Sequence, residues 1–394
     1  MIALGRELVA RGHEVWIETW RKWRDDCERE GMRFAAAPEY QVFPTRERPL
    51  KPYVAAVRAS AETAALIRAV DPEVVVADIL TVAAGLAAEI EDRPWATLVP
   101  HVLPVGEAGL PPYSLGMVTP RTAVGARLWR AARPLFRAGE ERGRAELNGA
   151  RERVGLPALG HLHGGISREL ALVATFPQLE YPRRSWEPSA RIVGPLLWER
   201  PFGEVELPPG DEPLVLVAPS TSQDPEHRLL RAALEGLADE PVRVLATTNR
   251  RPPPQRPLPV PANARLVDWV SYSRTMPRCD AVICHAGHGT LARSLVSGVP
   301  VLACPDVGDM AENAARVRWA GVGVSLPRRF QTPRGVRLAL RRLLSQPSYA
   351  ARARELRDWA AVSSGTARAA DAVEEFSLGH RAPGSRADTP TGYT

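Results

Sequence analysis

A short glycine-rich segment in the second half of the chain, residues 285–290, has the residue types that could bind a charged ligand. Residues 281–284 before it are apolar and predict a buried strand, and residues 291–297 after it have a helical pattern. The turn that follows a parallel strand lies at the carboxyl edge of its sheet, where open α/β folds bind ligands. We therefore expect this segment to form a binding site.

The chemistry predicted for this turn is the binding of a diphosphate. Gly287 and Gly289 allow a ligand to approach the backbone closely. The helix that follows offers free backbone N–H groups and the positive end of its dipole, and both favour an anion. His285 and Thr290 add two hydrogen-bonding side chains. No Asp-x-Asp sequence occurs in the chain, which agrees with a site that works without a metal ion.

The elements that must position this turn form an alternating series in residues 206–377. Six short apolar segments are separated by helical patterns, which predicts a parallel sheet covered on both faces by helices. The segments are 214–218, 242–246, 265–267, 281–284, 301–303 and 322–324. They predict a Rossmann-like second domain, preceded by a linker without periodicity between Gly194 and Pro213.

A similar alternation predicts a Rossmann-like first domain in residues 1–205, so the expected fold class is α/β with two doubly wound parallel sheets. Its expected strands are 13–17, 74–77, 96–99 and 171–175, and residues 104–125 are expected to be a long loop. The chain opens on a helical pattern, whereas a doubly wound domain normally begins with a strand. We therefore expect the natural protein to start upstream of Met1. The polar tail, residues 378–394, is expected to be disordered.

The composition excludes several classes of protein. The net charge is +6, but basic and acidic residues are interleaved and no basic block with aromatic residues appears, so nucleic-acid binding is not expected. The four cysteines form no C-x-x-C pair and are expected to be buried apolar residues. There is no signal peptide and no apolar run of about 18 residues, so we expect a cytoplasmic protein without a membrane span.

Read as a whole, the glycine-rich turn resembles the signature of UDP-glycosyltransferase-like enzymes of GT-B fold. After residues 285–290 come Gly298, Pro305, Asp309 and Asn313 at the signature's spacing. Bacterial natural-product and macrolide-type glycosyltransferases are the most similar in pattern. The resemblance covers nearly the whole chain and implies two Rossmann-like domains that face a cleft, with acceptor binding in the first and nucleotide-sugar binding in the second.

The resemblance also implies a donor site in the second domain. Its residues would be Ser220, Thr221, Trp269, Val270, His285, Gly287, Gly289, Thr290, Asp309 and Asn313. Trp269 would stack on the nucleoside base, and Asp309 would hold sugar hydroxyls. Two alternatives stay open, because Trp269 could be a core aromatic residue and Ser220 with Thr221 could be a helix cap.

Two positions depart from the family pattern. Arg293 stands where a glutamate usually grips the ribose hydroxyls, and Met310 stands where a glutamine usually contacts the sugar. A guanidinium group cannot accept hydrogen bonds, so the usual ribose contact is lost. The nucleotide and the sugar are therefore left open between UDP- and dTDP-linked hexoses.

An inverting transfer needs a base that takes the proton from the acceptor hydroxyl. In the family this base is a histidine after the first strand, which would lie upstream of this chain, oriented by an aspartate that Asp78 matches. Asp78 could alternatively be a helix cap. His101, Tyr113 and Met117, in and beside the long loop, are the candidates for acceptor binding.

These observations predict a glycosyltransferase that transfers a hexose from a nucleoside-diphosphate sugar to a hydroxyl of a small hydrophobic aglycone. The expected reaction is inverting, needs no metal and uses no cofactor other than the sugar nucleotide as co-substrate. A catalytically impaired homologue that binds nucleotide or a partner is one alternative, and a sugar-nucleotide epimerase or hydrolase is another. A nicotinamide dehydrogenase is disfavoured because no G-x-G-x-x-G opens either half.

Overall fold

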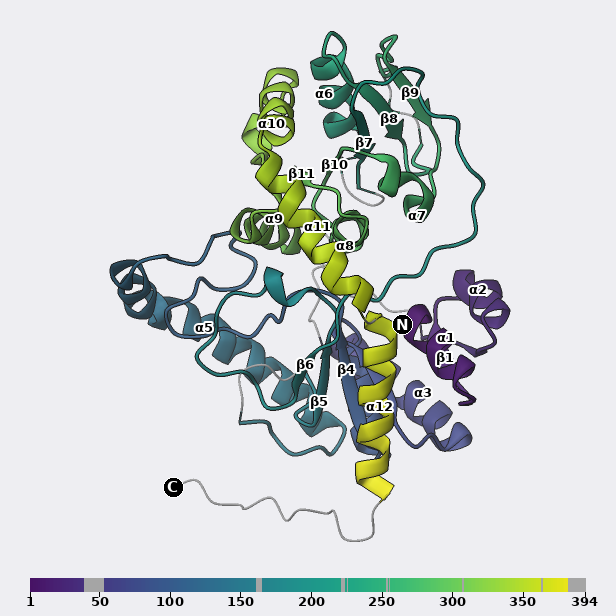
Figure 1. The fold of residues 1–394 in the computed structure, drawn as a ribbon. Coiled ribbons are helices and arrows are strands. Elements are labelled where there is room, and N and C mark those ends of the chain that lie inside the picture. Colours follow the sequence, from purple (N-terminus) through teal and green to yellow (C-terminus); the bar gives the residue numbers. More distant parts are fainter. Residues whose placement is uncertain are drawn as a thin grey trace.

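The structure is a computed structural model that describes residues 1–38, 53–160, 165–220, 226–252, 256–306, 308–362 and 364–381, together with Asp224 and Pro254. Two α/β domains lie one above the other, joined by an extended linker and by the C-terminal helices (Figure 1). None of the helices in these residues combines the length and the apolar character that crossing a membrane requires.

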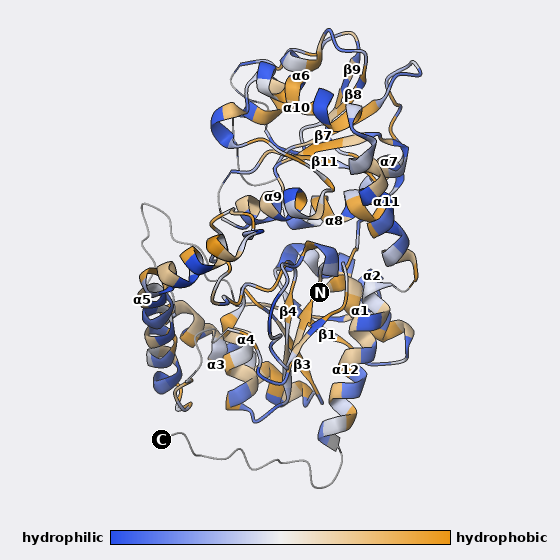
Figure 2. Cartoon of the chain, turned by 60° about the vertical axis from the view of Figure 1, so that its left-hand side comes forward, coloured by the Kyte–Doolittle hydropathy of each residue, from blue (hydrophilic) through white to orange (hydrophobic). Residues whose placement is uncertain are grey.

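The second domain contains a six-stranded parallel sheet in the order β12-β11-β10-β7-β8-β9. The strands are β7 (Leu214–Ala218), β8 (Arg243–Thr247), β9 (Ala264–Val267), β10 (Ala281–Cys284), β11 (Val301–Ala303) and β12 (Gly323–Ser325). They match the six apolar segments predicted from the sequence. The central strands are buried along their whole length, and Figure 2 shows them as hydrophobic ribbons between more polar helices. Burial on both faces explains why they read as continuous apolar runs.

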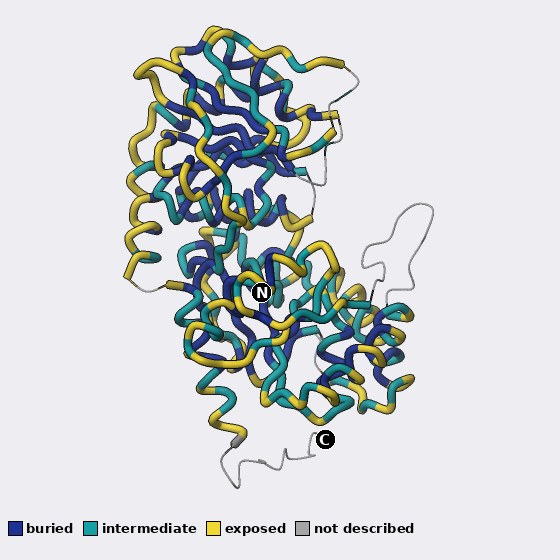
Figure 3. The backbone as a smooth tube through the Cα atoms, turned by 90° about the vertical axis from the view of Figure 1, so that its right-hand side faces the viewer, coloured by how far each residue is buried: buried dark blue, intermediate teal, exposed yellow. Residues whose placement is uncertain are grey.

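Helices cover both faces of this sheet. They are α6 (Arg228–Leu237), α7 (Tyr272–Thr275), α8 (His288–Val296), α9 (Asp309–Ala320), α10 (Pro333–Ser345) and α11 (Pro347–Val362), with short 3-10 turns at Met276–Arg278 and Arg328–Phe330. One core cluster contains apolar residues of α8, α9 and α11, and a second contains those of α6 and α10. Figure 3 shows the buried residues concentrated in the sheet between these two layers.

In the first domain, four parallel strands form one sheet and two more form a separate pair. The sheet is β3 (Val75–Asp78), β4 (Trp95–Val99), β5 (Leu170–Val173) and β6 (Ala190–Ile192), and the pair is β1 (Trp16–Thr19) with β2 (Arg33–Ala36). Its helices are α1 (Ile2–Ala10), α2 (Arg24–Arg29), α3 (Val54–Val70), α4 (Val82–Ile90) and α5 (Ala123–Arg153), with 3-10 turns at Arg21–Trp23 and Pro177–Leu179. The loop expected over residues 104–125 ends where α5 begins.

The last helix corrects the expected domain boundary and the expected tail. Helix α12 (Gly365–Arg381) lies along the first domain rather than the second (Figure 1). Its apolar face, with Ala369 and Val373, joins the core cluster of Leu4 and Leu98. The helix continues to Arg381, so residues 378–381 are helical although residues 378–380 are exposed, contrary to the predicted tail. Residues 382–394 lie outside the described residues.

Buried charges tie the two domains together beside the linker. Arg316 of α9 donates to a carboxylate oxygen of Glu312 at 2.8 Å, to the backbone oxygen of Leu179 at 3.1 Å and to Glu180 at 3.4 Å. Its guanidinium carbon also lies 3.4 Å from the ring centroid of Tyr181. Leu179, Glu180 and Tyr181 belong to the first domain, so this cluster fixes α9 against it.

Candidate active site

The glycine-rich turn has the geometry of a helix-terminus anion site. Strand β10 ends at Cys284, Ala286 takes a left-handed conformation with φ 64°, and Gly287 caps α8 without a side-chain hydrogen bond. Helix α8 therefore begins at His288, earlier than the sequence pattern predicted. The backbone N–H groups of its first turn have no capping side chain, which is the arrangement that phosphate-binding turns use.

The His285 imidazole lies directly beside this turn. A Cβ atom added to Gly287 would be 2.3 Å from its Nε2 atom, so only glycine lets the ring lie here. Burial lowers the pKa of His285, and a hydrogen bond with the backbone of Ala218 offsets part of this effect. Its Nδ1 atom is buried and has no hydrogen-bond partner among the described residues. The ring is therefore a neutral group with an unused polar atom.

Ser220 lies with His285 in one pocket at the carboxyl edge of the second sheet. The pocket has a cavity volume of about 80 Å³, which is enough for several water molecules or a small anionic group. Its lining residues are Ser220, Asp224, Arg228, Leu229, His285, Cys304, Asp306, Met310, Arg328 and Gln331. Thr221, predicted beside Ser220, lies outside the described residues. Met310, one of the two departures from the family pattern, faces this pocket.

Trp269 follows β9 on the same sheet edge and is half-buried, whereas Val270 is part of the core. The Trp269 ring stacks on that of Tyr272, with ring centroids 6.3 Å apart and an angle of 24° between the ring planes. The guanidinium carbon of Arg250 lies 4.9 Å from the centroid of Trp269. Tyr272 therefore holds the indole in place, as a base-stacking platform requires. Another described neighbour of the ring is the exposed Arg250.

Asp309 and Asn313 lie on α9, the helix that follows β11. Asp309 is the exposed first residue of the helix, where a ligand can reach its carboxylate. Asn313 is buried and its Nδ2 atom donates to the backbone oxygen of Ala286 at 2.9 Å. Asn313 therefore holds the glycine-rich turn in place. Gly289 is exposed and Thr290 is half-buried in the first turn of α8.

Arg293 connects α8 to the linker. Its guanidinium group donates to the backbone oxygen of Gly289 at 3.1 Å and to that of Trp198. Burial lowers the pKa of Arg293, and the nearby Glu199 carboxylate opposes that shift. Glu199 in turn accepts hydrogen bonds from the backbone N–H groups of Tyr272, at 2.7 Å, and Ser273, at 3.0 Å. Where the family has a ribose-binding carboxylate, this chain has a cation that fastens the linker.

His288 was not assigned a role from the sequence, yet it lies at the junction of the domains. Its Nε2 atom is 3.2 Å from the backbone oxygen of Ala174 in the first domain. Burial, and to a smaller extent the neighbouring His101, lower its pKa to about 4. The neutral ring therefore links α8 to the end of β5. The sequence signal for His288 was its place as the second histidine of the glycine-rich turn. Its contact could not be predicted from the sequence, because Ala174 lies 114 residues away in the chain.

The proposed acceptor residues lie on the facing domain. His101 stacks on Tyr113 with ring centroids 5.5 Å apart. Burial raises the pKa of Tyr113, and the Asp309 carboxylate of the second domain adds to that effect. A Cβ atom added to Gly116 would be 2.8 Å from that of Ala311 in α9. The long loop thus crosses to the donor side. The Met117 side chain is 46% exposed, so its contact with an acceptor stays a prediction.

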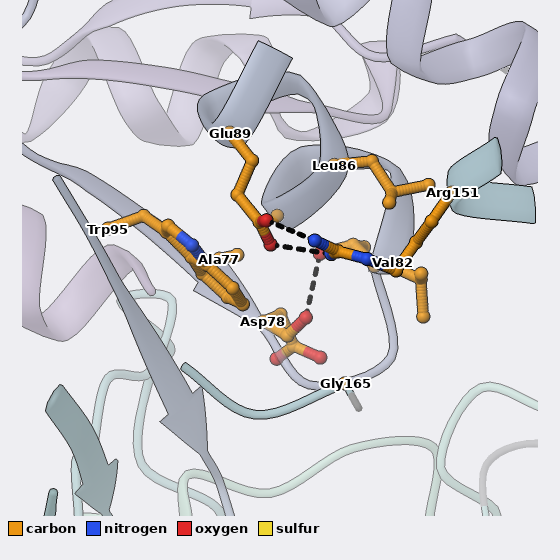
Figure 4. A pocket seen from close by; sticks show the side chains of 10 residues that line it. Ala77, Asp78, Val82, Leu86, Glu89, Trp95, Arg151 and Gly165 are labelled. Carbon is orange, nitrogen blue, oxygen red and sulfur yellow. Dashed lines mark hydrogen bonds and ion pairs between the residues drawn. The ribbon is translucent and has the colours of Figure 1, made fainter. Parts of the chain in front are cut away.

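Asp78 lies at the carboxyl end of β3, on the edge of the first sheet. Its Oδ1 atom accepts a hydrogen bond from the backbone N–H of Leu80 at 2.9 Å, which is the bond of a turn. The adjoining pocket, of about 10 Å³, is lined in part by the ion pair of Glu89 with Arg151 (Figure 4). That volume holds at most about one water molecule. The role of Asp78 in orienting a base stays a prediction.

Among the described residues, no group of three His, Cys, Asp or Glu side chains is placed to hold a metal ion. All four cysteines are buried and unpaired. Burial raises the pKa of Cys284 to about 12, so it is an inert thiol in the core, as the sequence predicted.

Comparison with known proteins agrees with this geometry. Residues 234–376 match the family model of the erythromycin biosynthesis protein CIII-like C-terminal domain. The chain is 29% identical to 4'-demethylrebeccamycin synthase of Lentzea aerocolonigenes over 413 residues, covering 95% of each protein.

Solved structures show the same fold. The chain matches the calicheamicin glycosyltransferase CalG4 with a TM-score of 0.75 and 24% identity, covering 97% of this chain and 95% of that one. It matches the glycosyltransferase VinC, solved in complex with dTDP, with a TM-score of 0.67 and 20% identity, covering 96% of both. The chain is therefore a glycosyltransferase of GT-B fold with an EryCIII-like C-terminal domain, and it is similar to glycosyltransferases of natural-product pathways.

Proposed function

We propose that this enzyme transfers a hexose from a UDP- or dTDP-sugar to a hydroxyl group of a small hydrophobic aglycone, with inversion and without a metal ion. The observation that carries the proposal is the pairing of an uncapped α8 N-terminus with the His285 ring and the Ser220 pocket. This arrangement suits a diphosphate, because backbone N–H groups at a helix N-terminus can donate hydrogen bonds to its oxygens and the polar His285 ring lies beside them.

The same groups would stabilise the leaving diphosphate. Negative charge develops on its oxygens as the bond to the sugar breaks, and fixed donors in a partly buried site stabilise that charge without reorganising. The α8 N-terminus and the Thr290 hydroxyl are such donors, and the His285 ring lies beside them. Since they already supply charge stabilisation, the reaction does not depend on a divalent cation at the diphosphate.

The acceptor would enter from the first domain. His101 stacks on Tyr113, the Asp309 carboxylate of the second domain acts on Tyr113, and Tyr113 is packed against the apolar core of the second domain. Mostly apolar walls with a few polar groups are typical of sites for small hydrophobic molecules. The dTDP complex of VinC supports a nucleoside-diphosphate donor.

A second candidate is a homologue that binds the nucleotide without turnover. Arg293 favours this candidate, because it stands where the family pattern has a glutamate that binds the ribose. Its guanidinium group donates instead to the backbone oxygens of Gly289 and Trp198. Asp78 favours it too, because its Oδ1 atom is used in a turn. Product formation separates the two candidates, whereas donor binding is expected for both.

The test is a thermal-shift screen of UDP- and dTDP-hexoses with the full chain, followed by mass spectrometry of reactions with hydroxylated aromatic and macrolide aglycones. We expect at least one donor to raise the melting temperature and one pair to give a product heavier by one hexosyl unit. Stabilisation without product in any pair would favour the binding homologue. No stabilisation by any donor would reject both candidates.

A further inference from the structure

The segment after β8 has an unusual backbone. Asn249 and Arg250 are consecutive residues with positive φ, 53° and 58°, a conformation that is uncommon outside glycine. Asn249 is buried and fixes the segment, because its Nδ2 atom donates to the backbone oxygen of Pro219 at 2.6 Å and its Oδ1 atom accepts from the Tyr272 hydroxyl at 3.1 Å. The Arg250 N–H donates to the backbone oxygen of Asp268 at 3.0 Å. The strained turn therefore presents Arg250 at one defined place.

That place is between two aromatic side chains. The guanidinium carbon of Arg250 lies 4.9 Å from the ring centroid of Trp269 and 5.7 Å from that of Phe202, which comes from the linker. Trp269 also stacks on Tyr272, which is buried and bonded to Asn249. Tyr272 is therefore a fixed neighbour of the indole. Arg250 is exposed, so it is the neighbour that can leave.

A guanidinium group and a pyrimidine base are both flat, and both stack on an indole. We propose that Arg250 is an internal occupant of the base-binding face of Trp269, which the donor base must displace, and that Phe202 is the second wall of the slot. Arg250 then sets the affinity for the base part of the donor but not for its diphosphate. This inference rests on the proposed function, since it takes Trp269 as the base platform.

The test uses calorimetric titration of the full chain with UDP and with inorganic pyrophosphate. In Arg250→Ala, UDP should bind about two- to fivefold more tightly, the factor that one exposed cation–π contact represents. Pyrophosphate should bind as in the wild type. Phe202→Leu should weaken UDP binding and leave pyrophosphate binding unchanged. The matched control is Arg274→Ala, which removes the same charge from the exposed surface of α7.

The outcomes separate this inference from the proposed function. Equal or weaker UDP binding by Arg250→Ala, with pyrophosphate binding intact, overturns the role of Arg250 and leaves the diphosphate site standing. Tighter binding by Arg274→Ala to the same extent also overturns it, because the effect would then be one of overall charge. If the wild type binds neither UDP nor pyrophosphate, the proposed function fails and this inference fails with it.

Discussion

Replacing Arg316 with methionine should uncouple the two domains. The Arg316 guanidinium group is 5% exposed and lies between the carboxylates of Glu312 and Glu180, which are each 2% exposed. It also donates to the backbone oxygen of Leu179 across the domain junction. Methionine fills much of the same volume but leaves two buried carboxylates without this cation.

The expected loss of stability follows from what each carboxylate keeps. Breaking a buried ion pair by removing one partner costs about 3–5 kcal/mol. Glu180 retains a 2.6 Å hydrogen bond from the Leu103 N–H and the more distant Arg183, 3.9 Å away. Glu312 loses its 2.8 Å partner. Because one of the two carboxylates stays partly satisfied, we expect the lower part of that range, about 3 kcal/mol.

The loss should depend on pH in a defined direction. Burial already raises the pKa of Glu180, and Arg316 opposes that shift, so the substitution raises the pKa of Glu180 further. A carboxyl group with a folded-state pKa above its unfolded value of about 4.3 binds more protons when folded. Its destabilising effect is absent below the unfolded pKa and grows as pH rises through the folded pKa. Arg316→Met should therefore be less damaging at pH 4.5 than at pH 7.5.

Urea denaturation of the wild type, Arg316→Met and Arg357→Met at both pH values measures this. Arg357 pairs with Asp358 on the exposed surface of α11, so its substitution should change the free energy of unfolding by no more than about 0.5 kcal/mol. A loss in Arg316→Met that is equally small, or one that is the same at both pH values, would refute the assignment of the buried cluster as the link between the domains.

Three further outcomes are expected. If Arg293 replaces a ribose-binding carboxylate, the wild type should bind uridine and thymidine diphosphates with similar affinity, and Arg293→Glu should prefer uridine diphosphate. A strong preference for uridine diphosphate in the wild type would contradict this. Gly287→Ala should displace the His285 ring, because the added Cβ lies 2.3 Å from Nε2, and should weaken pyrophosphate binding by titration calorimetry, whereas Gly379→Ala, with open space around it, should not. The pKa of His288 is lowered to about 4, so the stability that its neutral form contributes is present above about pH 6.5 and is lost as pH falls towards 4. His288→Asn should therefore make the melting temperature less sensitive to acid between these pH values. A melting profile that is unchanged by the substitution would count against this role.

The sequence predicted the features that are local. The strands of the second domain were found because each is a short apolar run ended by a breaker, and the turn at 285–290 was found because its glycines follow such a run. Helix α8 begins at His288 rather than three residues later, because Gly287 ends the turn in a conformation that periodicity does not record.

Features that depend on distant contacts were missed. The apolar stripe of α12 is visible in the sequence, but nothing in it says which domain the stripe will cover. The contact of His288 with Ala174 joins the two domains, and the position of Arg250 between Phe202 and Trp269 joins the linker to the second domain. Their residue types are ordinary, so only the fold shows what they do.

The central claim is that a nucleoside diphosphate binds at the α8 N-terminus beside His285. Titration calorimetry of the full chain with UDP and with dTDP tests it most directly, with His285→Ala as the variant and His380→Ala, on the exposed face of α12, as the control. The wild type and His380→Ala should bind alike, and His285→Ala should bind more weakly by about 1–3 kcal/mol, the range for a hydrogen bond to a charged group. Equal binding by His285→Ala, or no binding by the wild type, would contradict the site.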